Sequence, residues 1–137
     1  MKTKKRKIGD IGEELAARFL EKRGYKIVER NYLKKCGEID IVAKNKDGLH
    51  FIEVKSLTVK PYFVPPRGTS QGKDEYLPEA NIRLWKKQRM TRAIKTYLLD
   101  RKISDDQDFQ IDIAAVFLDF THKKARIRML ENVILDS

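Results

Sequence analysis

Apolar side chains recur at intervals of three and four residues in two stretches of the chain, and this spacing predicts two amphipathic helices. The first stretch covers positions 8–19 and predicts a helix over residues 8–23, ended by Gly24. The second has its apolar stripe at positions 90–98 and predicts a helix over residues 78–101.

Shorter stretches rich in β-branched and aromatic residues predict five strands. They cover residues 25–32, 38–43, 49–56, 109–118 and 126–130. The Asp47-Gly48 dipeptide predicts a tight hairpin between the second and third strands. The resulting order is α-β-β-β-α-β plus an edge strand. It predicts an α/β fold with a mixed central sheet flanked by helices. Residues 57–78 hold all 4 prolines and predict a long loop.

Composition limits the class of protein. A chain of 137 residues suits a single domain over residues 1–137. With 41% hydrophobic and 36% charged residues, neither a disordered chain nor a membrane protein is expected. The N-terminus lacks the apolar segment of a signal peptide, and the single cysteine, Cys36, excludes an internal disulfide. Both features predict a cytoplasmic protein.

The net charge of +10 is concentrated in two windows. Residues 1–7 hold five cations and are expected to form a disordered arm, and residues 83–102 hold eight cations with one acid. Such a concentration is typical of a surface that neutralises phosphates, so nucleic acid, DNA in particular, is the expected partner. The alternative is a solubilising face with a frayed basic tail. A second copy of the chain is a further candidate partner, and no membrane contact is expected.

Charged side chains stand where the strand pattern calls for apolar ones. Side chains alternate along a strand, so an even-numbered hairpin loop places Asp40, Glu53 and Lys55 on one face of the sheet. A two-residue turn sets Asp40 opposite Lys55, whereas a four-residue turn sets it opposite Glu53. In either arrangement the three Cβ atoms lie within about 4.5–8 Å of one another.

Two carboxylates at that distance repel each other unless a cation lies between them. Lys55 alone would make a structural ion cluster. Alternatively, Asp40 and Glu53 bind Mg²⁺ or Mn²⁺, because hard oxygen ligands without histidine or thiolate suit these ions. Such an ion activates water, and the lysine stabilises the developing charge.

The second predicted helix changes from apolar to basic along one face. At 100° per residue, Arg83, Lys86 and Lys87 lie within about 60° of the stripe centred on Met90. We therefore expect this end of the helix to extend over the site, with Lys87 as a phosphate contact. The alternative is that these cations lie in a solvated first turn. The candidate nucleic-acid contacts are Lys4, Lys5, Arg6, Lys7, Arg83, Lys86, Lys87 and Gln88.

Asp40 followed by Glu53-Val54-Lys55 resembles the PD-(D/E)xK signature of restriction-endonuclease-like nucleases. More closely, the chain resembles the YraN-like family of uncharacterised bacterial proteins, relatives of archaeal Holliday-junction resolvases. The matching stretches are GDIGE at 9–13, GY at 24–25, RN at 30–31, GEID at 37–40, EVK at 53–55, KQ at 87–88 and IDIAAV at 111–116. There are two departures: the loop after Lys55 is longer than expected, and Gln110 stands where an arginine is usual.

The resemblance implies a restriction-endonuclease-like fold and a metal-dependent nuclease acting on DNA, with branched or junction DNA among the candidates. It implies that Asp40 and Glu53 are metal ligands, that Lys55 is the catalytic lysine, and that Glu13 is a helix carboxylate directed at the site. The alternative is a non-catalytic nucleic-acid-binding protein that retains the fold. Outside this group, His50 is expected at the surface, and Asp112 is expected to pair with a helix-borne cation.

Overall fold

Two helices and five strands form the part of the chain that the structure describes. The computed structural model describes residues 3–59 and 84–133, with side chains of the second range from Gln88 onward. The elements are α1 Lys4–Lys22, β1 Lys26–Lys34, β2 Gly37–Asn45, β3 Gly48–Thr58, α2 Leu84–Asp100, β4 Phe109–Asp119 and β5 Lys124–Leu130. This order confirms the predicted α/β fold.

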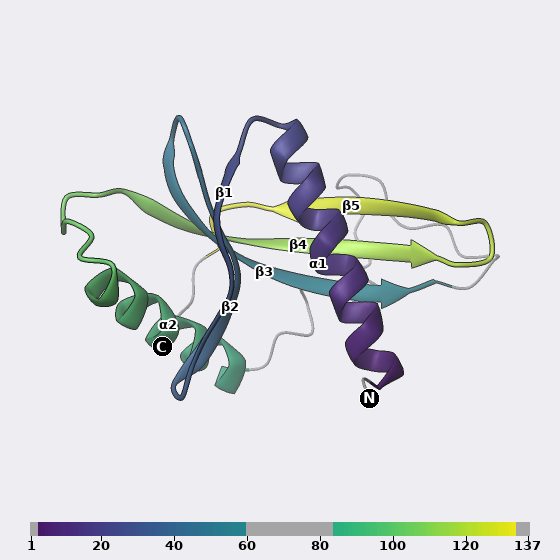
Figure 1. Ribbon diagram of the computed structural model, residues 1–137, viewed down its shortest axis with the longest axis horizontal. Coiled ribbons are helices and arrows are strands. Elements are labelled where there is room, and N and C mark those ends of the chain that lie inside the picture. Colours follow the sequence, from purple (N-terminus) through teal and green to yellow (C-terminus); the bar gives the residue numbers. More distant parts are fainter. Residues whose placement is uncertain (1–2, 60–83, 134–137) are drawn as a thin grey trace.

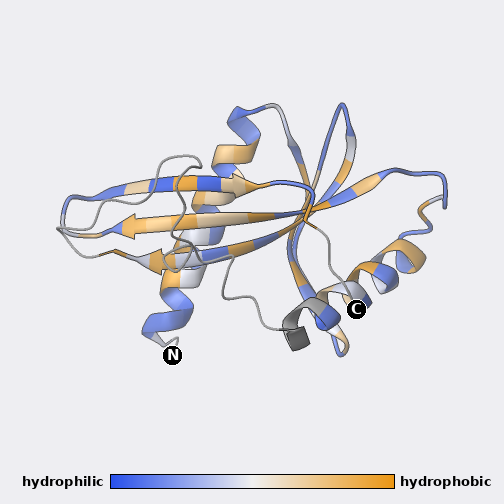
Figure 2. Cartoon of the chain, turned by 180° about the vertical axis from the view of Figure 1, so that it is seen from behind, coloured by the Kyte–Doolittle hydropathy of each residue, from blue (hydrophilic) through white to orange (hydrophobic). Residues whose placement is uncertain are grey.

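The five strands form one mixed sheet in the order β1-β2-β3-β4-β5. β3 and β4 are parallel, and the other neighbouring pairs are antiparallel. The hairpin of β1 and β2 runs across the direction of β3, β4 and β5 (Figure 1). The helices lie on opposite faces of the sheet, with α1 in front in Figure 1 and α2 in front in the reverse view (Figure 2).

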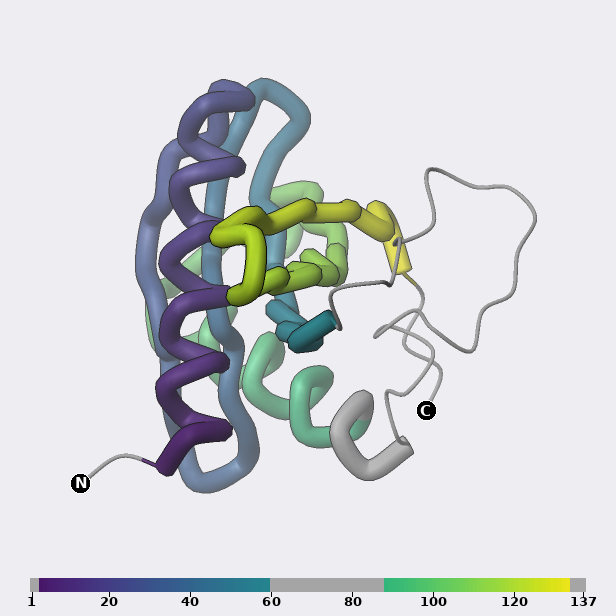
Figure 3. The backbone as a smooth tube through the Cα atoms, turned by 90° about the vertical axis from the view of Figure 1, so that its right-hand side faces the viewer, coloured from purple at the N-terminus to yellow at the C-terminus, as the bar shows by residue number. Residues whose placement is uncertain are grey.

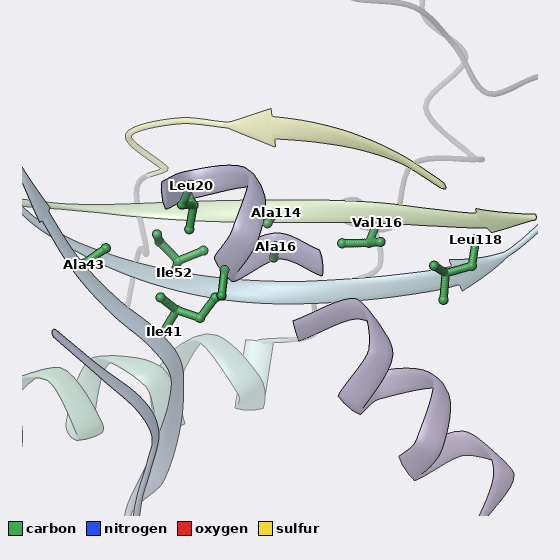
Figure 4. Close-up of a cluster of buried hydrophobic side chains, with 9 residues drawn as sticks. Ala16, Leu20, Ile41, Ala43, Ile52, Ala114, Val116 and Leu118 are labelled. Atoms are coloured by element: carbon green, nitrogen blue, oxygen red, sulfur yellow. The ribbon is translucent and has the colours of Figure 1, made fainter. Parts of the chain in front are cut away.

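Small residues bring α1 close to one face of the sheet, along which it runs (Figure 3). Ala16 and Leu20 pack against a cluster that includes Ile52 of β3 and Val116 of β4 (Figure 4). At Gly12 the approach is closest, because a Cβ placed there would lie 1.8 Å from Ser56 Oγ. Burial of these apolar surfaces, together with the fit at Gly12, fixes α1 on β3.

The apolar stripe predicted for the second helix is buried on the other face. Met90, Ala93, Ile94 and Tyr97 pack with side chains of β1, β2 and β3. At the end of α2, Arg101 makes a two-pronged hydrogen bond to Glu29 of β1, with distances of 2.7 and 3.1 Å. These contacts hold α2 against the hairpin of β1 and β2.

The N-terminal arm predicted over residues 1–7 is wrong from Lys4 onward, because α1 begins there. The Thr3 side chain accepts a hydrogen bond from the backbone N–H of Arg6 at 3.1 Å, as a helix N-cap does. This cap adds a turn that the apolar spacing does not reveal. The predicted loop lies mostly in 60–83, outside the described residues, and so does the predicted helix start at residue 78.

Candidate active site

The candidate site lies where β2 turns away from β3. The two strands pair from Asn45 and Gly48 at the turn as far as Ile41 and Ile52, and beyond this point β3 continues beside β4 (Figure 1). Continued by one pair, the register sets Asp40 opposite Glu53. This is the second of the two arrangements that the sequence leaves open.

A hydrogen bond from β3 fixes Asp40 at this split. The backbone N–H of Val54 donates to Asp40 Oδ2 at 2.8 Å. Asp40 is 7% exposed and Glu53 is 4% exposed, so both carboxyl groups are removed from water. The sheet therefore holds two acidic side chains together in a place where charge is costly.

Asp40 and Glu53 act on each other electrostatically. Burial raises the pKa of the Asp40 carboxyl well above its usual value, and the charge of Glu53 raises it further. The hydrogen bond from Val54 acts in the opposite direction, while the charges of Glu13 and Glu38 add smaller upward effects. A cation beside these groups would relieve the repulsion that raises this pKa.

Glu13 of α1 adds a third carboxyl group to Asp40 and Glu53. We call these three residues the acidic cluster. Its carboxyl is half-buried, and its pKa is raised first by burial and then by the charge of Glu38. The guanidinium of Arg30 opposes this shift. The structure thus brings a carboxylate from α1 into the electrostatic field of Asp40.

Lys55 lines a groove of about 560 Å³ between α1 and β3. Glu13 lines the same groove, and so do Lys4 and Lys5. The predicted contacts Arg6 and Lys7 do not line it. The groove is the part of the site that sequence reasoning missed, because it depends on how closely α1 packs on β3. The signal that could have found it is the small-residue face of Gly9 and Gly12.

Apart from Arg83, the remaining predicted nucleic-acid contacts belong to α2. Gln88 is exposed on that helix. Arg83 and the side chains of Lys86 and Lys87 lie outside what the structure describes, so their predicted contacts stay predictions.

The chemistry of the cluster fits a hard divalent cation. Its donors are carboxylate oxygens, which Mg²⁺ and Mn²⁺ prefer. Within residues 3–59 and 84–133, no three histidine, cysteine, aspartate or glutamate side chains lie close enough together to hold a metal. Mg²⁺ commonly uses only one or two carboxylates, with water and substrate phosphates in the other positions. Asp40 and Glu53 match that pattern.

His50 and Asp112 differ from their predicted environments. His50 is 2% exposed rather than at the surface, and its Nδ1 lies 2.7 Å from Asp112 Oδ2. Asp112 also accepts hydrogen bonds from Gln110 Nε2 and from the backbone N–H of Asn132, each at 2.9 Å. Asp112 is therefore a buried hub that joins β3, β4 and the segment after β5, and its partners here are not on a helix.

Fold and site together define an α/β protein with an acidic cluster at a strand split and a lysine-lined groove beside it. The family model described as Uncharacterised protein family UPF0102 matches residues 12–116, and the chain belongs to this family. This finding confirms the resemblance to the YraN-like family. The relation to nucleases stays a prediction.

Relatives match over nearly their whole length. A UPF0102 protein of Campylobacter hominis is 35% identical over 135 residues, which cover 98% of this chain and 100% of the relative. A UPF0102 protein of Clostridium acetobutylicum is 33% identical over 127 residues, covering 93% of each chain. A third, from Alkaliphilus metalliredigens, is 30% identical over 125 residues, which are 91% of this chain and 95% of the relative.

Neither described helix is long and apolar enough to cross a membrane.

Proposed function

We propose that this protein is a metal-dependent nuclease that hydrolyses phosphodiester bonds in DNA. The observation that carries the proposal is the placement of two buried carboxylates, Asp40 and Glu53, at the split between β2 and β3. Burial and mutual repulsion make this pair costly to the fold. A cation that binds there would offset the cost, and this gives the arrangement a functional reason.

Asp40 and Glu53 would hold Mg²⁺ or Mn²⁺. When bound, such an ion supplies a water of lowered pKa and neutralises charge on the phosphate. Asp40 is already oriented by the hydrogen bond from Val54, so its carboxylate needs little rearrangement on binding. The buried position also excludes bulk water, which strengthens every charge interaction at the reacting phosphate.

Lys55 would stabilise the negative charge that develops on the phosphate in the transition state. It follows Glu53 by two residues on β3, so strand alternation directs both side chains to the same face. Its ammonium group would act where charge appears during the reaction, which is where electrostatic catalysis is most effective. Glu13, at the edge of the cluster, would orient water by a hydrogen bond.

One observation favours the alternative, a non-catalytic nucleic-acid-binding protein. Lys4, Lys5 and Lys55 line the groove, and such a basic surface binds phosphates without a metal. A protein of this kind would use the lysines of the groove without cutting its ligand.

A cleavage assay separates the two functions. Labelled junction, flap, single-stranded and duplex DNA are incubated with the protein and Mn²⁺, with EDTA as the metal-free control. A nuclease cuts at least one substrate in Mn²⁺ only, and the Asp40→Asn variant prepared in the same way does not. Retardation of the substrates without cleavage would instead establish the binding protein. Equal cleavage by wild type and variant would indicate a contaminating nuclease.

A further inference from the structure

The groove beside the acidic cluster has two different walls. One wall is the N-terminal half of α1 and the other is the C-terminal half of β3. Its lining residues are Lys4, Lys5, Ile8, Gly9, Glu13, Val54, Lys55, Ser56, Leu57 and Thr58. Val54 lines the groove and donates to Asp40, so the groove lies next to the carboxylates described above.

The β3 wall belongs to the strand edge that β2 leaves. The pairing of β2 with β3 extends only to Ile52, and the next edge N–H, that of Val54, donates to Asp40. Backbone N–H groups alternate in direction along a strand, so those of Ser56 and Thr58 point to the same side as that of Val54. The edge of β3 that β2 leaves therefore carries further backbone hydrogen-bond donors at residues that line the groove.

The α1 wall carries positive charge at the N-terminus of the helix, where it destabilises α1. The first turn of α1 contains four consecutive cations, Lys4 to Lys7, and no acid. A helix dipole favours anions at this end and disfavours cations. An anionic ligand in the groove accounts for the charge of Lys4 and Lys5, which line it.

The remaining lining is largely aliphatic, and the volume is small. Ile8, Val54 and Leu57 offer apolar surface to sugars and bases. A volume of about 560 Å³ falls in the range of sites for small ligands. It suits one or two nucleotides of a single strand.

We infer that this groove binds a nucleic-acid single strand and leads it to the carboxylates, with phosphates on Lys4 and Lys5. The inference rests on the proposed function, because it takes Asp40 and Glu53 as the point that the strand reaches. It adds the substrate class: the preferred DNA has a single-stranded end or branch.

The first test compares two double variants with the same loss of charge on the same helix. Lys4→Ala with Lys5→Ala alters the groove, whereas Arg6→Ala with Lys7→Ala alters cations of the same turn that do not line it. Alanine keeps the helix in both variants. Binding of a fluorescein-labelled single-stranded oligonucleotide of ten thymidines is measured by anisotropy in EDTA, at several salt concentrations, so that no cleavage is required.

We expect the groove variant to lose at least tenfold in affinity and the salt slope to fall by about 1.4, which is about 0.7 for each of two phosphates. The matched variant should lose less than threefold. Equal losses would overturn the inference and leave only a generally basic surface. Failure of the wild type to bind the oligonucleotide would overturn it as well.

A second variant fills the groove without changing charge. A Cβ at Gly9 meets nothing within 4 Å, so the side chain of Gly9→Gln extends into the groove. Glutamine also favours a helix more than glycine, so the thermal midpoint should not fall. We expect the single-strand affinity to drop at least fivefold, and wild-type affinity would overturn the inference.

These outcomes are distinct from those of the cleavage assay. If the wild type binds the single strand through the groove and cuts no DNA, the proposed nuclease function fails and the groove assignment stands. If the wild type cuts DNA and the groove variants bind the single strand normally, the nuclease function stands and the groove assignment fails.

Discussion

Asp40→Asn removes one charge from the buried pair and keeps the shape of the side chain. Asparagine Oδ1 can still accept the hydrogen bond from Val54 N–H, so the local backbone has no reason to move. Repulsion between Asp40 and Glu53 disappears. Without metal, we therefore expect the variant to be more stable than the wild type at neutral pH.

The pH dependence of this difference follows from the raised pKa of Asp40. An acid whose pKa is higher in the folded than in the unfolded protein holds its proton more tightly when folded. The free energy of unfolding of the wild type therefore falls as the pH rises, from the unfolded value near 4 through the raised folded pKa. The difference in free energy of unfolding between wild type and variant isolates the effect of Asp40, because the contributions of the other carboxyl groups cancel.

Metal reverses the order of stability. At a Mn²⁺ concentration about a hundredfold above its dissociation constant, binding adds ~2.7 kcal/mol to the wild type. The entropy of unfolding of a chain of 137 residues is about 0.29 kcal/mol/K, so the midpoint rises by about 9 °C. Asp40→Asn, which loses a ligand, should show almost none of this rise.

The assay is thermal unfolding from pH 5 to pH 8, with and without Mn²⁺. Glu14→Gln is the matched control on α1, since Arg30 and Arg18 lower the pKa of the exposed Glu14 carboxyl. It should leave the metal response intact. A Mn²⁺-dependent rise that persists in Asp40→Asn would refute the metal assignment. An Asp40→Asn variant less stable than the wild type without metal would refute the electrostatic argument.

Two further predictions concern residues on β3. Lys55→Ala should lower the cleavage rate by at least a hundredfold and change DNA affinity by less than threefold, because its charge acts on the transition state. Kinetics on the substrate that the wild type cuts test this, and equal losses in rate and affinity would make Lys55 a phosphate clamp. His50→Ala should lower the free energy of unfolding by about 2–4 kcal/mol, because it leaves a cavity and deprives buried Asp112 of a partner. Urea unfolding measures this loss, and a change below about 1 kcal/mol would show that the pair does not stabilise the core.

Local periodicity alone determined most of the elements. The stripe of α2 from Met90 to Tyr97 is buried as its spacing predicts, and the strands lie where β-formers cluster. Alternation of side chains along β3 also places Glu53 and Lys55 on one face. These features depend on neighbours only a few residues away, so the sequence pattern carries them.

Tertiary packing decided the rest. Sheet twist and the packing of α1 against β3 decide three properties of the site. These are the register between β2 and β3, the point where the two strands separate, and the burial of Asp40. His50 and Asp112 are 62 residues apart in sequence and meet only because β3 pairs with β4. The groove of Lys4 and Lys5 likewise exists only because Gly12 lets α1 approach Ser56. Each of these properties arises from contacts between distant segments, and the pattern within a single element contains no information about them.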